Sequence, residues 1–193
     1  LAGDGLLNYA FETVLTAFDL VQDINWPEKY QYYERIMRAC RILAKKAGIY
    51  GMIGGQVIDI EGFEKDTGRE RLDHMYKLKT GALIEASMMI GAILAGATEQ
   101  ELELIEKIAG DIGLAFQIRD DILDVFSNQE TLGKPVHSDM KNDKITYVSI
   151  MNPEEANDEV LKISKRALDN YRMLAYRNDF LEELIIRLVY REK

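Results

Sequence analysis

The sequence contains little cysteine, little proline and too few basic residues to balance its acids. Among 193 residues it has 1 cysteine, 3 prolines, 24 Lys and Arg residues and 33 Asp and Glu residues, for a net charge of −9. A single thiol excludes a disulfide within the chain and fits a reducing compartment. The acidic balance argues against a nucleic-acid-binding surface, but it allows an anionic substrate, because bound metal ions can reverse the local charge.

Membrane features are also scarce. No uninterrupted apolar run reaches the length that spans a bilayer, and no basic-then-apolar signal peptide opens the chain. We therefore expect no membrane span and a cytoplasmic location. Cys40 stands on the apolar side of a helical pattern, and no basic group is evident to activate it, so we expect a buried and inert thiol.

The alternation of apolar and polar residues that marks strands is missing too, while 47% of the residues are hydrophobic. This pattern predicts an all-α fold with a single domain over residues 1–193. The opening stretch Leu1–Gly5 reads as the entry to a helix already inside a domain, so we expect that further residues precede Leu1. The expected helices cover about 4–22, 27–47, part of the stretch 48–60, and 70–94, then Thr98 to the end of an acidic motif, a short helix from Thr146, and about 154–174 and 178–192.

The acidic motif lies in the stretch Phe116–Asp124. On a helix, Gln117, Asp120, Asp121 and Asp124 share one face, because they are spaced at i, i+3, i+4 and i+7. Apolar residues cover much of the rest, which is typical of a buried helix. Carboxylates buried together repel one another unless a cation neutralises them, and hard oxygen ligands suit Mg²⁺ bound with substrate phosphates. The motif therefore predicts a Mg²⁺-diphosphate site at the mouth of a helical cavity.

A solvated acidic face is the alternative reading of this motif. The apolar background favours the metal site. Gly110 and Gly113 favour it too, because they extend the acidic face upstream with no side chain and so leave room for a ligand.

A second glycine-rich stretch precedes the acidic motif and is not a nucleotide loop, because it lacks the required strand-to-helix context. Gly51, Gly54 and Gly55 lie on or near one side of a helix, where they allow close packing or leave space for a ligand. We favour close packing. Gln56 and Asp59 are polar groups in an apolar stretch, so each needs a partner.

Residues Lys77–Leu83 interrupt a long helical pattern. Gly81 predicts a kink that exposes the Lys79 carbonyl, and the same point carries the Lys79 ammonium and the Thr80 hydroxyl. A site with these groups can stabilise an anion through the ammonium and a cation through the carbonyl and hydroxyl oxygens. An ordinary pair of surface lysines, Lys77 and Lys79, is the alternative.

Two polar stretches, 61–71 and 127–143, read as loops. A loop that follows an acidic helix end can fold over a ligand as a lid. Lys134 and Lys144, within and just after the second loop, are candidate phosphate partners, and solvated surface lysines are the alternative.

Taken together, these stretches resemble the trans-prenyltransferases, that is, the farnesyl and geranylgeranyl diphosphate synthases. The resemblance runs through nearly the whole chain, and its motifs occur in the family's order. It implies an all-α, isoprenoid-synthase-type bundle of mostly antiparallel helices around a central cavity, of which this chain is the C-terminal portion. The matching stretches are Gly3–Glu12, Gly51–Gln56, Lys79–Leu83, Gly113–Asp124, Leu132–Lys134 and Lys144–Tyr147.

The resemblance also implies a reaction. An allylic diphosphate ionises, the double bond of isopentenyl diphosphate attacks the cation, and a proton is lost, in a protein that is a homodimer. Mg²⁺ is the implied cofactor. The implied roles are Mg²⁺ binding for Asp120, Asp121 and Asp124, allylic diphosphate binding for Lys79, Lys134 and Lys144, and carbocation stabilisation for Thr80, the Lys79 carbonyl and Gln117.

The chain departs from the family pattern at several points. The family's first aspartate-rich motif and its isopentenyl diphosphate site lie upstream of the Gly3 match, so we expect these 193 residues alone to be inactive. Smaller departures are Tyr76, where the family often has His, His137, often Gly, and Ile145, often Ser.

The leading hypothesis is a short-chain prenyl diphosphate synthase that makes farnesyl diphosphate, with a geranylgeranyl diphosphate synthase as the alternative. A class I terpene cyclase shares the helical fold, but the stretches Lys79–Gly81 and Leu132–Lys134 argue against it. A non-catalytic partner subunit of an active synthase is the third possibility. The complete aspartate motif and Lys79 argue against that reading, because a partner subunit needs no second metal site.

Overall fold

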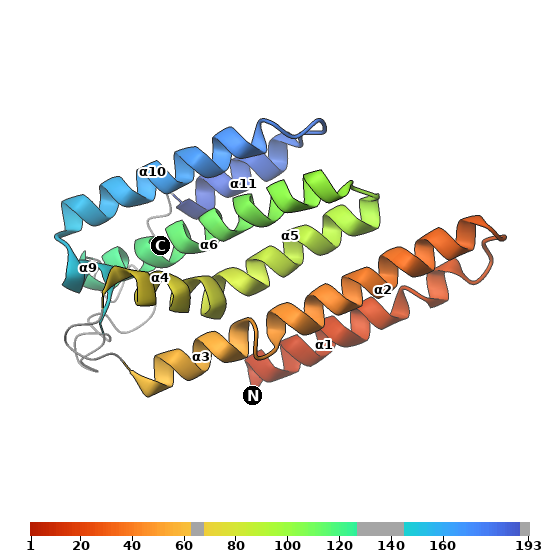
Figure 1. Ribbon diagram of the computed structural model, residues 1–193, viewed down its shortest axis with the longest axis horizontal. Helices are drawn as coiled ribbons and strands as arrows, with labels where there is room; N and C mark the ends of the chain where they lie inside the picture. The colour runs from red at the N-terminus through yellow and green to blue at the C-terminus, as the bar shows by residue number, and fades with distance from the viewer. Residues whose placement is uncertain (63–67, 127–144, 190–193) are drawn as a thin grey trace.

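The computed structural model describes residues 1–62, 68–126 and 145–189, and within these ranges it contains helices and turns but no strand. The helices run side by side and mostly antiparallel (Figure 1). The predicted all-α fold is confirmed. The elements are α1 Ala2–Thr16, η1 Asp19–Val21, α2 Glu28–Ala47, α3 Met52–Glu61, α4 Arg69–Tyr76, η2 Lys77–Gly81, α5 Ala82–Ala95, α6 Glu99–Phe126, α9 Tyr147–Ile150, α10 Pro153–Tyr171 and α11 Asp179–Val189.

The 28-residue helix α6 lies at the centre of the bundle. It packs against α5 and η2 on one side and against α10 and α11 on the other, while α2 covers the outer side of α5 (Figure 1). Ile108, Ile112 and Ile118 of α6 are almost completely buried. Because α6 is buried on several sides, its polar residues must find partners inside the bundle.

Side-chain caps mark the starts of the two main helices. The Thr98 N–H donates to Glu101 Oε2 at 2.8 Å and the Glu101 N–H donates back to Thr98 Oγ1 at 3.3 Å, which is the capping box that their spacing predicts. The Thr98 N–H and then the Thr98 hydroxyl, which both donate to Glu101 Oε2, lower the pKa of Glu101. At α10, Asn152 and Glu155 form a second capping box ahead of the first-turn proline, Pro153.

The helix boundaries differ from the predicted ones at several points. The first helix ends at Thr16 and not near residue 22. The Thr16 hydroxyl donates to the Thr13 carbonyl at 2.8 Å, a local bond that competes with the next helical turn. The polar stretch 61–71 is shorter than predicted, because α4 begins at Arg69. The last two helices end at Tyr171 and Val189.

Cys40 is half-buried and not fully buried as expected. The buried residues of α2 are Ile36, Ala39, Leu43 and Ala47. Cys40 follows Ala39 in the sequence and therefore lies at the edge of this buried face. Burial raises the pKa of the Cys40 thiol, which fits the inert thiol that we expect.

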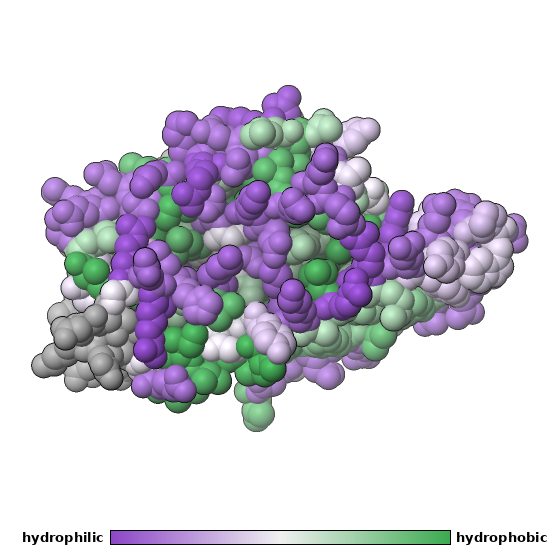
Figure 2. All heavy atoms as spheres, in the orientation of Figure 1, coloured by the Kyte–Doolittle hydropathy of each residue, from purple (hydrophilic) through white to green (hydrophobic). Residues whose placement is uncertain are grey.

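Apolar side chains remain uncovered on α1 and α3. Among the described residues, none of α1 is buried, and Leu6 and Tyr9 are largely exposed, as are Val57 and Ile60 of α3. Green patches gather along the lower edge of the molecule, where Figure 1 places these two helices (Figure 2). Exposed apolar side chains gathered on one side of a protein commonly mark an interaction site.

The run Arg69–Ala95 is the one described helix whose length and composition would allow it to cross a membrane, with a mean hydropathy of 1.5 over its most apolar window. This differs from the expectation that no stretch is apolar enough. The α5 part of the run packs between α2 and α6, and helices of a protein core pass the same test. The absence of a membrane span therefore stays a prediction.

Candidate active site

The helical run from α4 to α5 changes from an α-helix to a π-helix at η2 and then returns to an α-helix. Residues Lys77–Gly81 form a π-helical segment, so the helix is irregular where a kink was predicted at Gly81, while exposure of the Lys79 carbonyl stays a prediction. Segments with i→i+5 hydrogen bonds are rare and frequently occur at functional sites. Here the segment contains Lys79 and Thr80, two of the predicted site residues.

Two glycines from neighbouring helices let their backbones approach this segment. A Cβ atom on Gly55 of α3 would lie 2.2 Å from the backbone nitrogen of Lys79. A Cβ atom on Gly113 of α6 would lie 2.7 Å from the Cα atom of Gly81. Close packing is therefore confirmed as the role of Gly55. The interpretation of Gly113 as ligand space is wrong, because the backbone of Gly81 occupies that space.

Thr80 and Gln117 face each other across the contact between η2 and α6. The Thr80 hydroxyl donates to Gln117 Oε1 at 2.9 Å, and Gln117 Nε2 donates to Asp121 Oδ1 at 3.4 Å. Two predicted cation-stabilising residues and one predicted metal ligand are thus joined by hydrogen bonds in a polar line that runs from η2 onto α6.

Asp121 is only 3% exposed and is held by further donors. The Tyr76 hydroxyl donates to Asp121 Oδ2 at 2.6 Å, and the backbone N–H of Tyr147 donates to the same oxygen at 3.0 Å. The rings of Tyr76 and Tyr147 stack with centroids 5.9 Å apart and an interplanar angle of 22°. The sequence did not identify these two tyrosines as partners of Asp121, although a buried tyrosine hydroxyl usually needs an acceptor.

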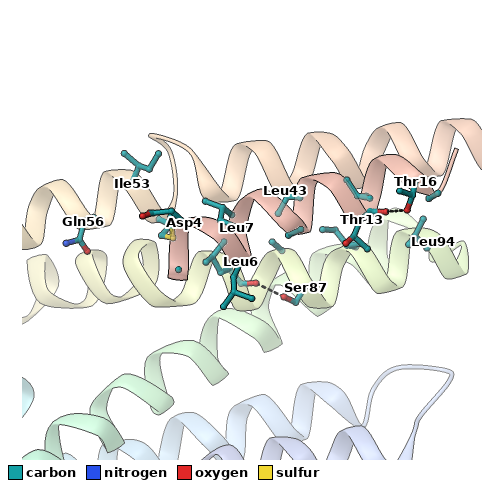
Figure 3. A pocket seen from close by; sticks show the side chains of 18 of the residues that line it. Asp4, Leu6, Leu7, Thr13, Thr16, Leu43, Ile53, Gln56, Ser87 and Leu94 are labelled. Carbon is teal, nitrogen blue, oxygen red and sulfur yellow. Dashed lines mark hydrogen bonds between the residues drawn. The ribbon is translucent and has the colours of Figure 1, made fainter. Parts of the chain in front are cut away.

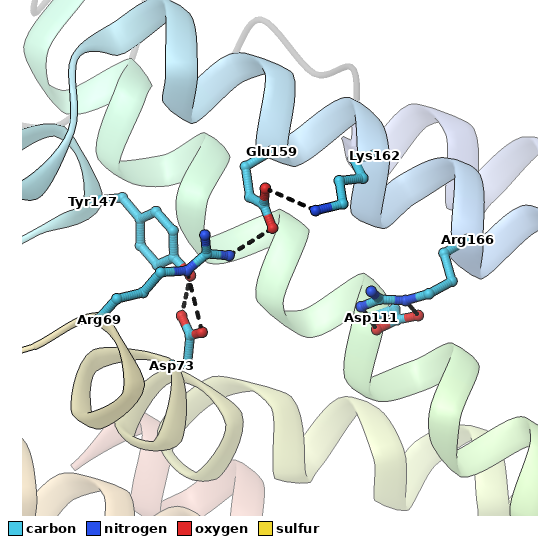
Figure 4. A network of polar contacts seen from close by, with 7 residues as sticks. All are labelled: Arg69, Asp73, Asp111, Tyr147, Glu159, Lys162 and Arg166. Atoms are coloured by element: carbon cyan, nitrogen blue, oxygen red, sulfur yellow. Dashed lines mark hydrogen bonds and ion pairs between the residues drawn. The ribbon is translucent and has the colours of Figure 1, made fainter.

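Tyr147 joins this line to a second polar network that ties α4 to α10 (Figure 4). Its hydroxyl donates to Asp73, and its ring lies 5.5 Å from the guanidinium carbon of Arg69. Arg69 in turn pairs with Glu159 of α10 at 2.6 Å, which raises the pKa of Arg69. Burial, then the Asp73 carboxylate, raises the pKa of Tyr147, so its phenol stays protonated.

Lys79 pairs with Asp59 of α3, with 2.7 Å between Nζ and Oδ2. The side chain of Asp59 is 12% exposed and that of Lys79 is 32% exposed. The partner that Asp59 requires is therefore the lysine predicted to bind diphosphate. Lys134, His137 and Lys144 lie outside the described residues, so their predicted roles stay predictions.

The aspartate set supplies suitable donors for Mg²⁺ without forming a complete cage. Asp121 and Asp124 are buried and Asp120 is half-buried. Within residues 1–62, 68–126 and 145–189, no three His, Cys, Asp or Glu side chains are grouped so that they could hold a metal ion. Mg²⁺ commonly takes only one or two carboxylates together with substrate phosphates and water, so these carboxylate oxygens fit it chemically.

An apolar cavity of about 1270 Å³ opens between α1, α2, α3 and α5. Gln56 lies at one end of it and Leu94 and Thr16 lie at the other (Figure 3). Leucine and isoleucine side chains such as Leu7 line its walls. Because α3, which carries Gln56, packs against η2, the cavity begins beside the segment that contains Lys79 and Thr80.

A family model described as "Polyprenyl synthetase" matches residues 1–176. The chain belongs to the polyprenyl synthetase family. It is 39% identical over 190 residues to the chloroplastic heterodimeric geranylgeranyl pyrophosphate synthase large subunit 1 of Arabidopsis thaliana, covering 96% of this chain and 48% of the relative. It is 36% identical to the farnesyl diphosphate synthase of Bacillus subtilis (strain 168), covering 100% of this chain and 62% of the relative.

The solved structures agree with this polyprenyl synthetase assignment. A geranyltransferase from Helicobacter pylori, complexed with magnesium and isoprenyl diphosphate, superimposes with a TM-score of 0.75 at 28% identity, over 97% of this chain and 57% of that one. The chain thus spans about half to three fifths of the length of these polyprenyl synthetase relatives. The names of the relatives are divided between farnesyl and geranylgeranyl synthases.

Proposed function

We propose that the full-length protein is a short-chain prenyl diphosphate synthase that condenses an allylic diphosphate with isopentenyl diphosphate and makes farnesyl diphosphate. The observation that carries this proposal is the polar line Thr80–Gln117–Asp121, which lies beside one end of a large apolar cavity. A geranylgeranyl product is the second candidate, because several relatives bear that name.

Mg²⁺, held by Asp120, Asp121 and Asp124 together with diphosphate oxygens, would neutralise the charge that develops on the leaving group. The chain itself supplies the remaining parts of the site. The Lys79 ammonium, which pairs with Asp59, is placed to bind the diphosphate. Lys134 and Lys144 are proposed as its further partners.

Ionisation breaks the allylic C–O bond, and its electron pair leaves with the diphosphate. The allylic cation then takes an electron pair from the double bond of isopentenyl diphosphate, and loss of a proton restores a double bond. The oxygens of Thr80, Gln117 and the Lys79 backbone would face the cation and stabilise it. The apolar walls of the cavity exclude water, which would otherwise trap the cation as an alcohol.

The test uses the protein at its full natural length. We expect that incubation with isopentenyl diphosphate, dimethylallyl diphosphate and Mg²⁺ gives farnesyl diphosphate, identified by mass. Geranylgeranyl diphosphate as the final product would support the second candidate. Absence of any product would contradict both and favour the partner-subunit hypothesis.

We also propose that residues 1–193 alone do not turn over, because the resemblance places the isopentenyl diphosphate site outside them. The same assay on the isolated 193 residues checks this. A homodimer and a cytoplasmic location complete the proposal. The uncovered apolar side chains of α1 support an association of subunits, which light scattering would measure, and cell fractionation would test the location.

A further inference from the structure

The carboxylate of Asp121 receives hydrogen bonds from three different parts of the chain. Tyr76 donates from the end of α4, Gln117 from the preceding turn of α6, and the Tyr147 backbone from the first residue of α9. Of these donors from the described residues, Tyr76 and Tyr147 converge on Oδ2. A carboxylate held in this way has its orientation fixed before any ligand arrives.

Tyr76 is the one of these donors that donates through a hydroxyl, and its ring is held by stacking. Its side chain is 5% exposed, and its ring lies against the ring of Tyr147. Tyr147 is fully buried and is also held by Asp73, which accepts from its hydroxyl, and by Arg69, which lies over its ring. Because this packing fixes the position of the Tyr76 hydroxyl, the hydroxyl holds the Asp121 carboxylate in one orientation.

We propose that Tyr76 is a positioning residue, whose hydroxyl orients Asp121 and thereby the acidic face of α6 toward the metal and diphosphate. The proposal rests on the proposed function above. Partners that orient the groups around a metal typically change metal affinity by about 10–100-fold when they are removed. Tyr76 would act through Asp121 and need not contact the substrate.

The experiment compares Tyr76→Phe with Tyr171→Phe in the full-length protein. The first substitution removes only the hydroxyl and keeps the ring that stacks on Tyr147. The second removes a hydroxyl at the end of α10 that donates to the Asn178 carbonyl and accepts from the Asn178 N–H, both at 2.8 Å. Tyr76→Phe loses one hydrogen bond to a carboxylate and Tyr171→Phe loses two hydrogen bonds between neutral groups, so unfolding by urea should give losses of stability of similar size.

Two readouts separate positioning from mere stability. The first is the thermal shift that Mg²⁺ produces in the presence of inorganic diphosphate, and the second is the Mg²⁺ concentration that gives half-maximal turnover. For Tyr76→Phe we expect a smaller thermal shift and a Mg²⁺ requirement about tenfold higher. For Tyr171→Phe we expect both readouts to match the parent.

An unchanged Mg²⁺ requirement and thermal shift in Tyr76→Phe, with an active parent, would overturn the positioning role alone. A parent with neither product nor a Mg²⁺-dependent shift would instead overturn the proposed function. Should Tyr76→Phe not fold, Tyr76→His and Tyr76→Leu make the same comparison, because only the imidazole keeps a donor. The proposal then expects the His variant to require less Mg²⁺ than the Leu variant, and equal requirements would contradict it.

Discussion

The Thr80 hydroxyl and the Gln117 side-chain carbonyl are joined by a 2.9 Å hydrogen bond, although the two residues are 37 positions apart in sequence. One belongs to η2 and the other to α6. The resemblance assigned each of them a share in stabilising the carbocation. The structure makes them one unit, because the orientation of each depends on the other.

A double-mutant cycle on this pair should therefore be non-additive. We expect Thr80→Val and Gln117→Leu each to lower turnover, and the double variant to lose clearly less than the product of the two losses. Residues that share a hydrogen bond typically show coupling of about 0.5–3 kcal/mol. Turnover of the full-length protein at saturating Mg²⁺ measures it, and strictly multiplicative losses would show that the two residues act separately.

Asp120→Ala should lower turnover by orders of magnitude and leave the fold intact, because it removes a metal ligand that acts mainly in the transition state. Circular dichroism would verify the fold. Asp169→Ala is a matched control, because Asp169 is an exposed acid of α10 that pairs with Lys165. Near-normal turnover of Asp120→Ala would contradict its assignment as a metal ligand.

Gly55→Ala should disrupt the packing of α3 on the π segment. Its new methyl group would lie 2.2 Å from the Lys79 nitrogen, a backbone atom that cannot move aside cheaply. We expect a loss of about 1–3 kcal/mol in the free energy of unfolding, measured with urea. Gly91→Ala in α5 is the control. No neighbouring atom lies within 4 Å of its Cβ position, so the same change should stabilise by about 0.5–1 kcal/mol.

Lys46→Met should destabilise the chain strongly. Lys46 pairs with Glu85, which is 2% exposed, and with Glu106 at 2.6 Å. Burial alone would lower the pKa of Lys46, but its bonds to Glu106 and Glu85 raise it. Removing the cation leaves Glu85 as a buried, uncompensated charge, at a cost of about 3–5 kcal/mol.

The exposed neighbour Lys45 provides the control for this substitution. We expect Lys45→Met to change the free energy of unfolding by less than about 0.5 kcal/mol. Equal effects of the two substitutions would mean that the ion pair with Glu85 contributes little.

The ion pair between Arg69 and Glu159 predicts a pH dependence of stability. Burial alone would raise the pKa of Glu159, but its bonds to Arg69 and the charge of Lys162 lower it overall. A lowered pKa in the folded state stabilises the fold above the ordinary value for glutamate, about 4.3, and this contribution is lost as the pH falls through the folded value.

We therefore expect Glu159→Gln to lose about 1 kcal/mol near neutral pH and to show a smaller loss of stability on acidification than the parent. Urea unfolding at several pH values measures this. Glu183→Gln removes an exposed partner of Arg187 and should have a weaker effect. Parallel pH curves for Glu159→Gln and the parent would contradict the role of Glu159.

Much of the fold was predictable because helix starts and irregularities depend on residues that are close together in the sequence. The Thr98–Glu101 cap and the Asn152–Pro153 start were found from the sequence, and Gly81 indicated the irregularity in its helix. The partners of the site were not predictable in this way. Tyr76 reaches Asp121 across 45 positions of sequence, and Gly113 meets the Gly81 backbone only after two helices have packed. Such pairs depend on which helices become neighbours, and a single sequence does not encode that in any local pattern.

The π segment has a consequence for the phase of the helix that contains it. In a regular α-helix, two residues five positions apart differ in direction by about 140°, since each residue turns the chain by about 100°. Tyr76 and Gly81 are five apart, yet both meet α6, one at Asp121 and the other at Gly113. The wider turn absorbs one residue and brings the two positions back into register. Deleting a single residue there would place the two positions four apart, about 40° apart in direction in a regular α-helix, so both would still face α6 and only the wide turn around Lys79 and Thr80 would be lost.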